Sequence, residues 1–266
     1  MRYFDTGRLL VAALAAFMTA SAHAVDGACR ASSGTSTTPV IELYTSEGCD
    51  SCPPADRWLA SQFAPGETGE NAIALAFHVD YWDRLGWTDR FAAAAYTERQ
   101  YDAMRANRAN FVYTPQVLLQ GRNFDQWRSG TPAAALAAIS GVPAHAAVEI
   151  EASVDARTHT AEIKAVARPV GANAAKPGVL SVAYTDSALV SEVKAGENRG
   201  VRLTHDHVVR ALKTVPLAKS GEGTLAARFE PPAEAGTRTT LVAFVQERDS
   251  GEILQAVALP LAACAR

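Results

Sequence analysis

The 266-residue sequence has no dense block of lysine or arginine and no internal repeat. After its first two dozen residues it also has no apolar run of membrane-spanning length. Its formal net charge is −3, with 25 basic and 28 acidic side chains spread along the chain. The missing basic patch argues against nucleic acid or an anionic membrane surface as a partner. The missing apolar run argues against a membrane span.

Residues 1–24 have the pattern of a cleaved secretory signal. Arg2 and Arg8 precede the apolar stretch LLVAALAAFMTA, and Ala22 and Ala24 supply small residues for cleavage. The apolar stretch of 12 residues is too short to span a membrane. The pattern therefore predicts a periplasmic or secreted protein that begins at Val25. Its net charge is −4, because the signal removes two arginines and one aspartate.

Cysteine is scarce, and all four cysteines follow the signal: Cys29, Cys49, Cys52 and Cys264. Export to an oxidising compartment permits disulfides. The simplest of the three pairings joins Cys49 to Cys52, and joins Cys29 to Cys264 as a structural bridge between the chain ends. That second bridge closes a loop of about 235 residues, which the chain-entropy model values at roughly 5 kcal/mol. A lipid anchor at Cys29 is the alternative, although Asp26 occupies a position where such a signal needs an apolar residue.

The composition and the hydrophobic pattern change along the chain. Residues 25–38 are small and polar and are expected to form a flexible lead-in. Residues 39–144 alternate short apolar strands with helical patterns. The expected strands are 39–46, 71–82, 116–120 and 122–127, and the expected helices are 54–63, 88–109 and 132–140. This order, β-α-β followed by a helix, a β-hairpin and a final helix, is typical of the thioredoxin fold.

From residue 145 to residue 266 the hydrophobic period becomes two. Val148, Ile150 and Ala152 alternate with polar residues. Further strand-like runs separated by turn residues are 179–185, 203–215, 224–230, 239–247 and 252–260. Several such strands without helices indicate a β-sandwich. The expected fold class is therefore an α/β thioredoxin-like domain followed by an all-β sandwich-like C-terminal domain, with the boundary near residue 144.

The motif TSEGCDSCPPAD places a C-x-x-C pair between the first expected strand and the first expected helix. In this context such a pair is typical of a redox site. Cysteines at a helix start can have depressed thiol pKa values, because the unpaired amides favour the thiolate. Cys49 is expected to be the more exposed nucleophile, and Cys52 is expected to resolve the mixed disulfide. Asp50 adds negative charge beside Cys49 and opposes thiolate formation.

Four longer motifs are distinctive: IELYTSEGCDSCPPAD, AFHVDYWDRLGWTDRF, YTPQVLLQG and GENRGVRLTHDHVVRAL. Together they resemble a bacterial family of exported thioredoxin-like proteins that is catalogued as a domain of unknown function. The resemblance covers residues 39–260. It implies a thioredoxin-like fold, the C-x-x-C at Cys49 and Cys52, and a β-rich C-terminal extension, with no established substrate. In thioredoxin-like proteins a cis-proline faces the C-x-x-C, which implies a cis Thr114–Pro115 bond beside the cysteines.

Three other residues are candidates to bind a substrate near the pair: Thr114, His78 and Trp82. His78 is also a candidate to exchange protons with the thiols. The alternative for His78 is a hydrogen-bonded histidine in a packed aromatic loop. His205 and His207 resemble a metal-binding pair, but two ligands are too few. The sequence therefore predicts no metal and no cofactor.

Three functions remain open from the sequence. The leading hypothesis is an exported thiol–disulfide oxidoreductase that acts on a protein or small-molecule thiol or disulfide. A second is a binding module in which the Cys49–Cys52 bond is merely structural. A third is a Cu(I)-binding or metal-delivery protein that uses both cysteines as soft ligands. Redox titration of the pair, together with Cu(I) competition, separates the three.

Overall fold

The computed structural model describes residues 28–63, 72–155, 157–158, 160–171, 176–230 and 238–264. The predicted signal at residues 1–24 lies outside the described residues. The helical elements are α1 (Pro53–Gln62), η1 (Asp80–Leu85), α2 (Ala94–Ala106), η2 (Asp125–Ser129), α3 (Ala133–Ser140) and η3 (Leu261–Ala263). The strands are β1 (Ala28–Ser32), β2 (Val40–Thr45), β3 (Ile73–His78), β4 (Gln116–Leu119), β5 (Arg122–Asn123), β6 (Ala146–Val154), β7 (Ala161–Pro169), β8 (Gly178–Asp186), β9 (Leu189–Glu192), β10 (Arg202–His205), β11 (Val208–Pro216), β12 (Gly223–Phe229), β13 (Thr240–Glu247) and β14 (Ile253–Pro260).

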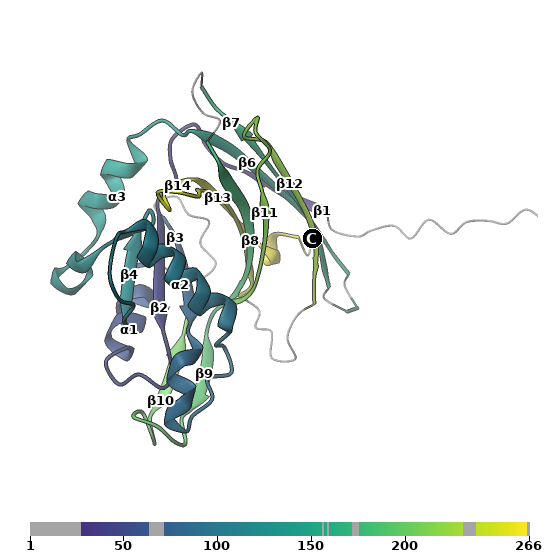
Figure 1. The fold of residues 1–266 in the computed structure, drawn as a ribbon. Helices are drawn as coiled ribbons and strands as arrows, with labels where there is room; N and C mark the ends of the chain where they lie inside the picture. The colour runs from purple at the N-terminus through teal and green to yellow at the C-terminus, as the bar shows by residue number, and fades with distance from the viewer. Residues whose placement is uncertain are drawn as a thin grey trace, which may run out of the picture.

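A long mixed sheet runs through most of the described chain (Figure 1). Its eight strands follow the order β14-β13-β8-β11-β3-β2-β4-β5. β2 pairs in parallel with β3 and antiparallel with β4. β11 pairs in parallel with β3, where Val208 lies opposite Ala76. This last contact joins strands from the two halves of the chain into one sheet.

The expected fold class, an α/β thioredoxin-like domain followed by a sandwich-like domain, is wrong. Taken together, the described residues form more strands than helices, and one mixed sheet crosses the boundary expected near residue 144. The physical reason is that β11 pairs with the edge of β3, an edge that two separate domains would have left unpaired. β8 and β13 are also buried on both faces along most of their length. Such burial suits central strands of a large sheet, whereas a sandwich strand exposes one face.

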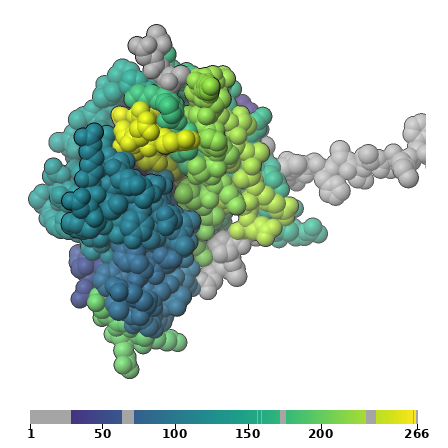
Figure 2. Space-filling model, viewed as in Figure 1, coloured from purple at the N-terminus to yellow at the C-terminus, as the bar shows by residue number. Residues whose placement is uncertain are grey.

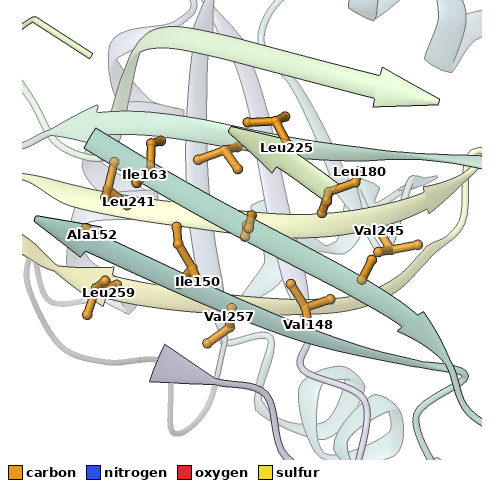
Figure 3. Packing of buried hydrophobic residues seen from close by; sticks show 14 of the residues in the cluster. Val148, Ile150, Ala152, Ile163, Leu180, Leu225, Leu241, Val245, Val257 and Leu259 are labelled. Carbon is orange, nitrogen blue, oxygen red and sulfur yellow. The ribbon is translucent and has the colours of Figure 1, made fainter. Parts of the chain in front are cut away.

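A second sheet has the order β1-β6-β7-β12 and packs its inner face against the long sheet (Figure 3). The period of two expected from residue 145 onward is present in β6, because Val148 and Ile150 are fully buried whereas Glu149 and Glu151 are not. The two buried residues pack against Leu180 and Leu241 of the long sheet. β1 pairs antiparallel with β6, so residues 28–32 of the expected flexible lead-in form a strand.

Helices cover both faces of the long sheet around β2. Leu59 of α1 and Leu136 of α3 pack with Leu43 on one face. Tyr96 of α2 packs with Tyr44 on the other face. Leu43 and Tyr44 are consecutive, and side chains alternate across a strand. β2 is therefore buried on both sides, and residues 46–49, which leave its C-terminal end, are buried as well.

The turns after β4 and after β13 approach each other at two glycines. Gly121 and Gly251 have φ values of +77° and +71°, which favour glycine. A Cβ atom on Gly121 would collide with the carbonyl oxygen of Gly251, and one on Gly251 would lie 2.9 Å from Cβ of Ala106. This close packing brings the C-terminal segment, yellow in Figure 2, beside the blue and teal surface around α2.

Candidate functional site

The C-x-x-C motif forms the turn that connects β2 to α1. Backbone bonds from Cys49 N–H to the Ser46 carbonyl and from Cys52 N–H to the Cys49 carbonyl, each 3.2 Å, close two successive turns. Cys52 is the N-cap of α1, and Pro53 and Pro54 occupy its first two positions. Proline is tolerated there because the first amides of a helix have no intrahelical acceptor. The local sequence therefore fixes the cysteines at the start of the helix, as predicted.

Both predicted disulfides are confirmed. Cys49 is bonded to Cys52, and Cys29 is bonded to Cys264. The second bridge joins β1 to the segment after β14, where Cys264 is 3% exposed and packs in the core between the two sheets. It spans 235 residues of sequence, whereas the first spans three. The two bridges therefore constrain the unfolded chain very differently.

The two cysteines of the motif are less accessible than predicted. Cys49 and Cys52 are both 0% exposed, whereas Asp50 and Ser51 between them are exposed. The prediction that Cys49 is the more exposed cysteine is therefore wrong. The disulfide lies just below the surface, and Asn198 from the C-terminal half of the chain packs on the turn that carries it.

A chain of hydrogen bonds ends on the Cys49 sulfur. The indole Nε1 of Trp82 donates to Thr114 Oγ1 at 2.8 Å, and Thr114 Oγ1 donates to Cys49 Sγ at 3.3 Å. An indole N–H can only donate, so Thr114 Oγ1 accepts from Trp82 and keeps its own proton to donate. Ser51 Oγ is a further hydroxyl near Cys49 Sγ, at 3.4 Å. The Thr114–Pro115 peptide bond is cis, as predicted.

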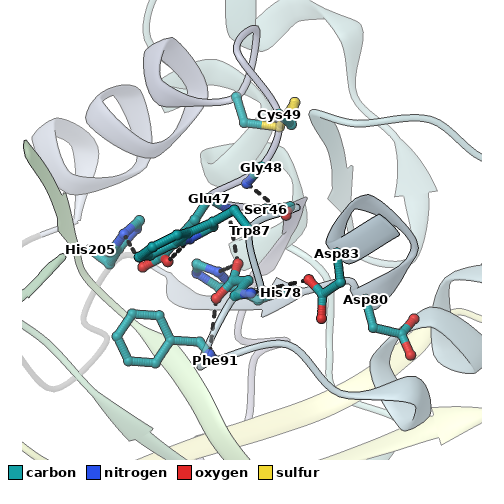
Figure 4. Close-up of polar contacts among 12 residues, drawn as sticks. Ser46, Glu47, Gly48, Cys49, His78, Asp80, Asp83, Trp87, Phe91 and His205 are labelled. Atoms are coloured by element: carbon teal, nitrogen blue, oxygen red, sulfur yellow. Dashed lines mark hydrogen bonds and ion pairs between the residues drawn. A yellow bond between two sulfur atoms is a disulfide. The ribbon is translucent and has the colours of Figure 1, made fainter. Parts of the chain in front are cut away.

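The candidate site residues differ in their access to solvent. Thr114 and Trp82 are half-buried beside Cys49, whereas Pro115 is buried. His78 is 0% exposed, so it has no surface to offer a substrate. Its ring instead lies in a polar cluster beneath the cysteine turn (Figure 4). The structure therefore brings Trp82, Thr114 and Cys49 together and places His78 elsewhere.

The polar cluster behind the turn is built around two carboxylates. Asp89 accepts hydrogen bonds from His78 Nδ1 at 2.7 Å, from the Glu47 N–H at 2.8 Å and from the Phe91 N–H at 2.9 Å. The Glu47 carboxylate accepts a hydrogen bond from Trp87 Nε1 at 2.7 Å.

His205 completes this cluster. Its Nε2 lies 3.3 Å from Glu47 Oε1, without the alignment of a hydrogen bond. The His205 and His78 rings meet edge to face, with their centroids 5.0 Å apart. Glu47, Asp89, His78 and His205 are each no more than 2% exposed.

The buried groups shift one another's ionisation. Burial alone lowers the pKa of His78, but the Asp89 carboxylate more than offsets this, so the pKa of His78 is raised. Burial raises the pKa of Asp89, but His78 and the two backbone donors lower it to about 2. Burial also raises the pKa of Glu47, and the neighbouring His205 imidazole reverses this to a net lowering. Asp89 therefore favours the protonated form of His78, while His78 and the two backbone amides favour the ionised form of Asp89.

Asp89→Asn is expected to destabilise the protein by about 3 kcal/mol at pH 7, because it removes a buried carboxylate that accepts hydrogen bonds from His78 and from two backbone amides. Asp89 has a pKa below its ordinary value of 3.8, so its contribution is present above that pH and is lost as the pH falls towards 2. His78 has a raised pKa, so its contribution is lost as the pH rises through that value. Urea unfolding at several pH values measures the loss of stability at low pH and the loss at high pH.

The matched control for this prediction is Asp102→Asn, which removes an exposed carboxylate paired with Arg105 on α2. Exposed pairs contribute less than about 1 kcal/mol. The difference in unfolding free energy between wild type and Asp89→Asn should become smaller as the pH falls from 4 to 2. A difference that stays constant over this range would show that Asp89 acts through its shape and not through its charge.

Sequence reasoning missed three contributors to this region: Glu47, Asp89 and Asn198. It also considered His205 only as a metal ligand. The available signal was that these residues fall inside the distinctive motifs TSEGC, GWTDRF and GENRGVRLTHDH, which meet in the folded chain. Their contacts connect positions up to 151 residues apart. Spacing along the chain does not reveal such contacts.

The histidine pair at residues 205 and 207 does not form a metal site. His207 has a φ of +57°, which ends the strand pattern expected across 203–215 and separates β10 from β11. His205 therefore points towards Glu47, whereas His207 Nε2 lies 3.0 Å from the Phe63 carbonyl oxygen. Within the described part of the chain, no group of three or more His, Cys, Asp or Glu side chains is arranged to hold a metal ion. No helix of the described residues is long and apolar enough to cross a membrane.

Comparison with known proteins gives a family and two similar structures. A family model described as "Protein of unknown function (DUF1223)" matches residues 40–246. A crystal structure of a protein from Agrobacterium tumefaciens is similar, with 28% identity, a TM-score of 0.57, and coverage of 85% of this chain and 95% of that chain. HBP35 of Porphyromonas gingivalis is 17% identical, with a TM-score of 0.58 and coverage of 85% and 76%, and shows similarity of fold alone. No match was found among curated proteins.

Proposed function

The chain belongs to the DUF1223 family of unknown function, and we propose that it is an exported thiol–disulfide oxidoreductase whose reacting pair is Cys49 and Cys52. Its partner is a thiol or disulfide of a protein or a small molecule. The two disulfides support residence in an oxidising compartment, periplasmic or extracellular, because cytosolic thiols are kept reduced.

The observation that carries this proposal is the hydrogen-bond chain from Trp82 through Thr114 to Cys49 Sγ. A donor aimed at a sulfur stabilises its thiolate more than its thiol. Trp82 polarises the Thr114 hydroxyl, which makes it a better donor. The thiolate is the form that attacks a disulfide, so this chain favours Cys49 as the nucleophile.

The exchange proceeds in two steps with Cys49 as the attacking group. The Cys49 thiolate attacks one sulfur of the partner disulfide, forms a mixed disulfide and releases the partner's other sulfur as a thiolate, which takes a proton from water. The Cys52 thiol then loses its proton, and its sulfur attacks Cys49 Sγ. This closes the Cys49–Cys52 bond and releases the second partner thiolate. The partner gains two electrons, the cysteine pair loses two, and the reverse sequence oxidises a partner dithiol.

The size of the closed loop argues against a purely structural role for this bridge. Cys49 and Cys52 are three residues apart, and the chain-entropy model gives such a short loop only about 2 kcal/mol. The turn already has backbone hydrogen bonds of its own, and the Asn198 side chain holds it as well. The bond is therefore not needed to define the turn, which is consistent with a pair that opens and closes.

Thr114→Val keeps the shape of the side chain and removes the hydroxyl donor to Cys49. Hydrogen bonds to charged groups contribute about 1.5–3 kcal/mol, so we expect alkylation of the reduced protein at Cys49 to slow by about tenfold at pH 7. Rates with iodoacetamide, followed by peptide mapping, measure this effect. Ser51→Ala is the control and should have a smaller effect, because Ser51 is exposed and water replaces its hydroxyl. Equal rates for wild type and Thr114→Val would contradict the role given to Thr114.

The proposed function is tested by redox titration of the native protein in glutathione buffers. Differential alkylation and peptide mapping then report the state of each cysteine pair separately. We expect Cys49–Cys52 to titrate between about −120 and −300 mV, the range of thiol–disulfide oxidoreductases, while Cys29–Cys264 stays oxidised. If Cys49–Cys52 also stays oxidised throughout this range, the bond is structural and the proposal is wrong.

A further inference from the structure

β9 and β10 form a two-stranded hairpin that belongs to neither of the two large sheets. In Figure 1 it extends beyond the end of β2, where the cysteine turn begins. The hairpin loop runs from Val193 to Val201 and comes from the C-terminal half of the chain. An isolated two-stranded hairpin is marginally stable by itself. Its position therefore depends on side-chain contacts with the elements beneath it.

Asn198, in the hairpin loop, makes the central contact with the cysteine turn. Its Nδ2 donates to the carbonyl oxygen of Glu47 and to that of Cys49, each at 2.9 Å. Asn198 is 6% exposed, so these bonds are shielded from water. The neighbouring Glu197 carboxylate accepts a hydrogen bond from the Asp50 N–H at 3.2 Å. Two consecutive loop residues thus bind three backbone groups around Cys49.

Further contacts hold the hairpin against the same turn. Glu47 Oε1 lies 3.3 Å from His205 Nε2 on β10, while Glu47 Oε2 accepts the hydrogen bond from Trp87. Gly196 has a φ of +74°, and a Cβ atom there would lie 3.3 Å from the Trp87 Cβ. The base and the loop of the hairpin therefore both pack on the residues that lead to Cys49.

We propose that Asn198 controls access to Cys49, and that the hairpin loop must move away from the cysteine turn before a partner sulfur can react. This inference rests on the proposed oxidoreductase function. Its basis is the contrast between Cys49, which is 0% exposed, and the adjacent Asp50, which is exposed and whose amide is held by the loop. Because the hairpin pairs with no other strand among the described residues, the loop can open without breaking either large sheet.

This arrangement makes Asn198 a determinant of which partners react. A small dithiol needs a small opening to reach the sulfurs, whereas a larger thiol needs a wider displacement of the loop. Releasing the loop should therefore accelerate the larger reagent more than the smaller one. A residue that merely stabilised the fold would change both rates by the same factor.

The test compares the rates at which dithiothreitol and reduced glutathione open the Cys49–Cys52 bond, followed by alkylation and peptide mapping. Asn198→Ala removes both hydrogen bonds to the turn, and Asn198→Asp keeps the size but points oxygen at the two carbonyls. We expect both variants to react about tenfold faster with glutathione, with a smaller gain for dithiothreitol. Arg202→Ala is the matched control, because Arg202 lies on the same hairpin in an exposed pair with Glu192. It should leave both rates unchanged.

Thermal unfolding of each variant establishes whether it is folded. If Asn198→Ala does not fold, the rates measured with Asn198→Asp alone test the inference. Folded variants that react at wild-type rates, or that gain equally with both reagents, overturn the inference. That result would leave the oxidoreductase proposal intact if the native pair still titrates in glutathione buffers. Conversely, faster opening in the Asn198 variants combined with a pair that exchanges with no disulfide substrate would support the access role and reject the proposed function.

Discussion

Cys49→Ser is expected to abolish exchange between the reduced protein and a disulfide substrate, whereas Cys52→Ser is expected to accumulate a covalent adduct through Cys49. The reason is the donor chain that ends on Cys49 Sγ, which favours the thiolate at that position. Without Cys52 the first attack still occurs, but no second thiol displaces the partner. The reduced variant is incubated with a small protein that contains a disulfide. Non-reducing electrophoresis and mass spectrometry then detect the adduct.

The two cysteine variants also test the assignment of roles. Both side chains are fully buried and both replacements are serine, so differences in stability should be small. An adduct with Cys49→Ser but not with Cys52→Ser would reverse the roles. Exchange that continues at the wild-type rate in both variants would reject the cysteine pair as the reacting group.

The double variant Cys29→Ala/Cys264→Ala is expected to lose about 5 kcal/mol of unfolding free energy, whereas Cys49→Ala/Cys52→Ala should lose only about 2 kcal/mol. The two bridges close loops of very different length, with sequence separations of 235 and three residues. For a protein of this size the larger loss corresponds to a decrease in Tm of about 10–20 °C. Urea and thermal unfolding of both double variants measure the difference.

The wild-type protein with both disulfides intact is the reference for this comparison. The order of the two effects matters more than their absolute size, because each pair also leaves buried space when it is replaced by alanine. If the Cys49/Cys52 double variant is the less stable of the two, that bridge has a structural role. The argument for a pair that opens and closes would then fail.

Much of the site could be predicted because it is determined locally. The apolar strand 40–45 is followed directly by the turn residues Ser46-Glu47-Gly48. The prolines after Cys52 then place the cysteines at the start of α1. The disulfide pairing followed from four cysteines, of which two are near neighbours and two lie close to the ends of the described chain. The cis Thr114–Pro115 bond followed from the resemblance of the surrounding motif. These features depend on residues that are close in sequence or on a recognisable motif.

The tertiary structure decided the sheet topology and the surroundings of the cysteines. A hydrophobic period shows which faces of a strand are buried, but it does not show which strand lies beside it. The pairing of β11 with β3 therefore could not be derived from the pattern, and the predicted division into two fold types was wrong. In the same way, Asn198 reaches the Cys49 carbonyl from 149 residues away, and the Glu47–His205 contact joins β10 to the cysteine turn. Such contacts depend on how distant segments meet, and the local propensities that shape a turn or a strand contain no information about that meeting.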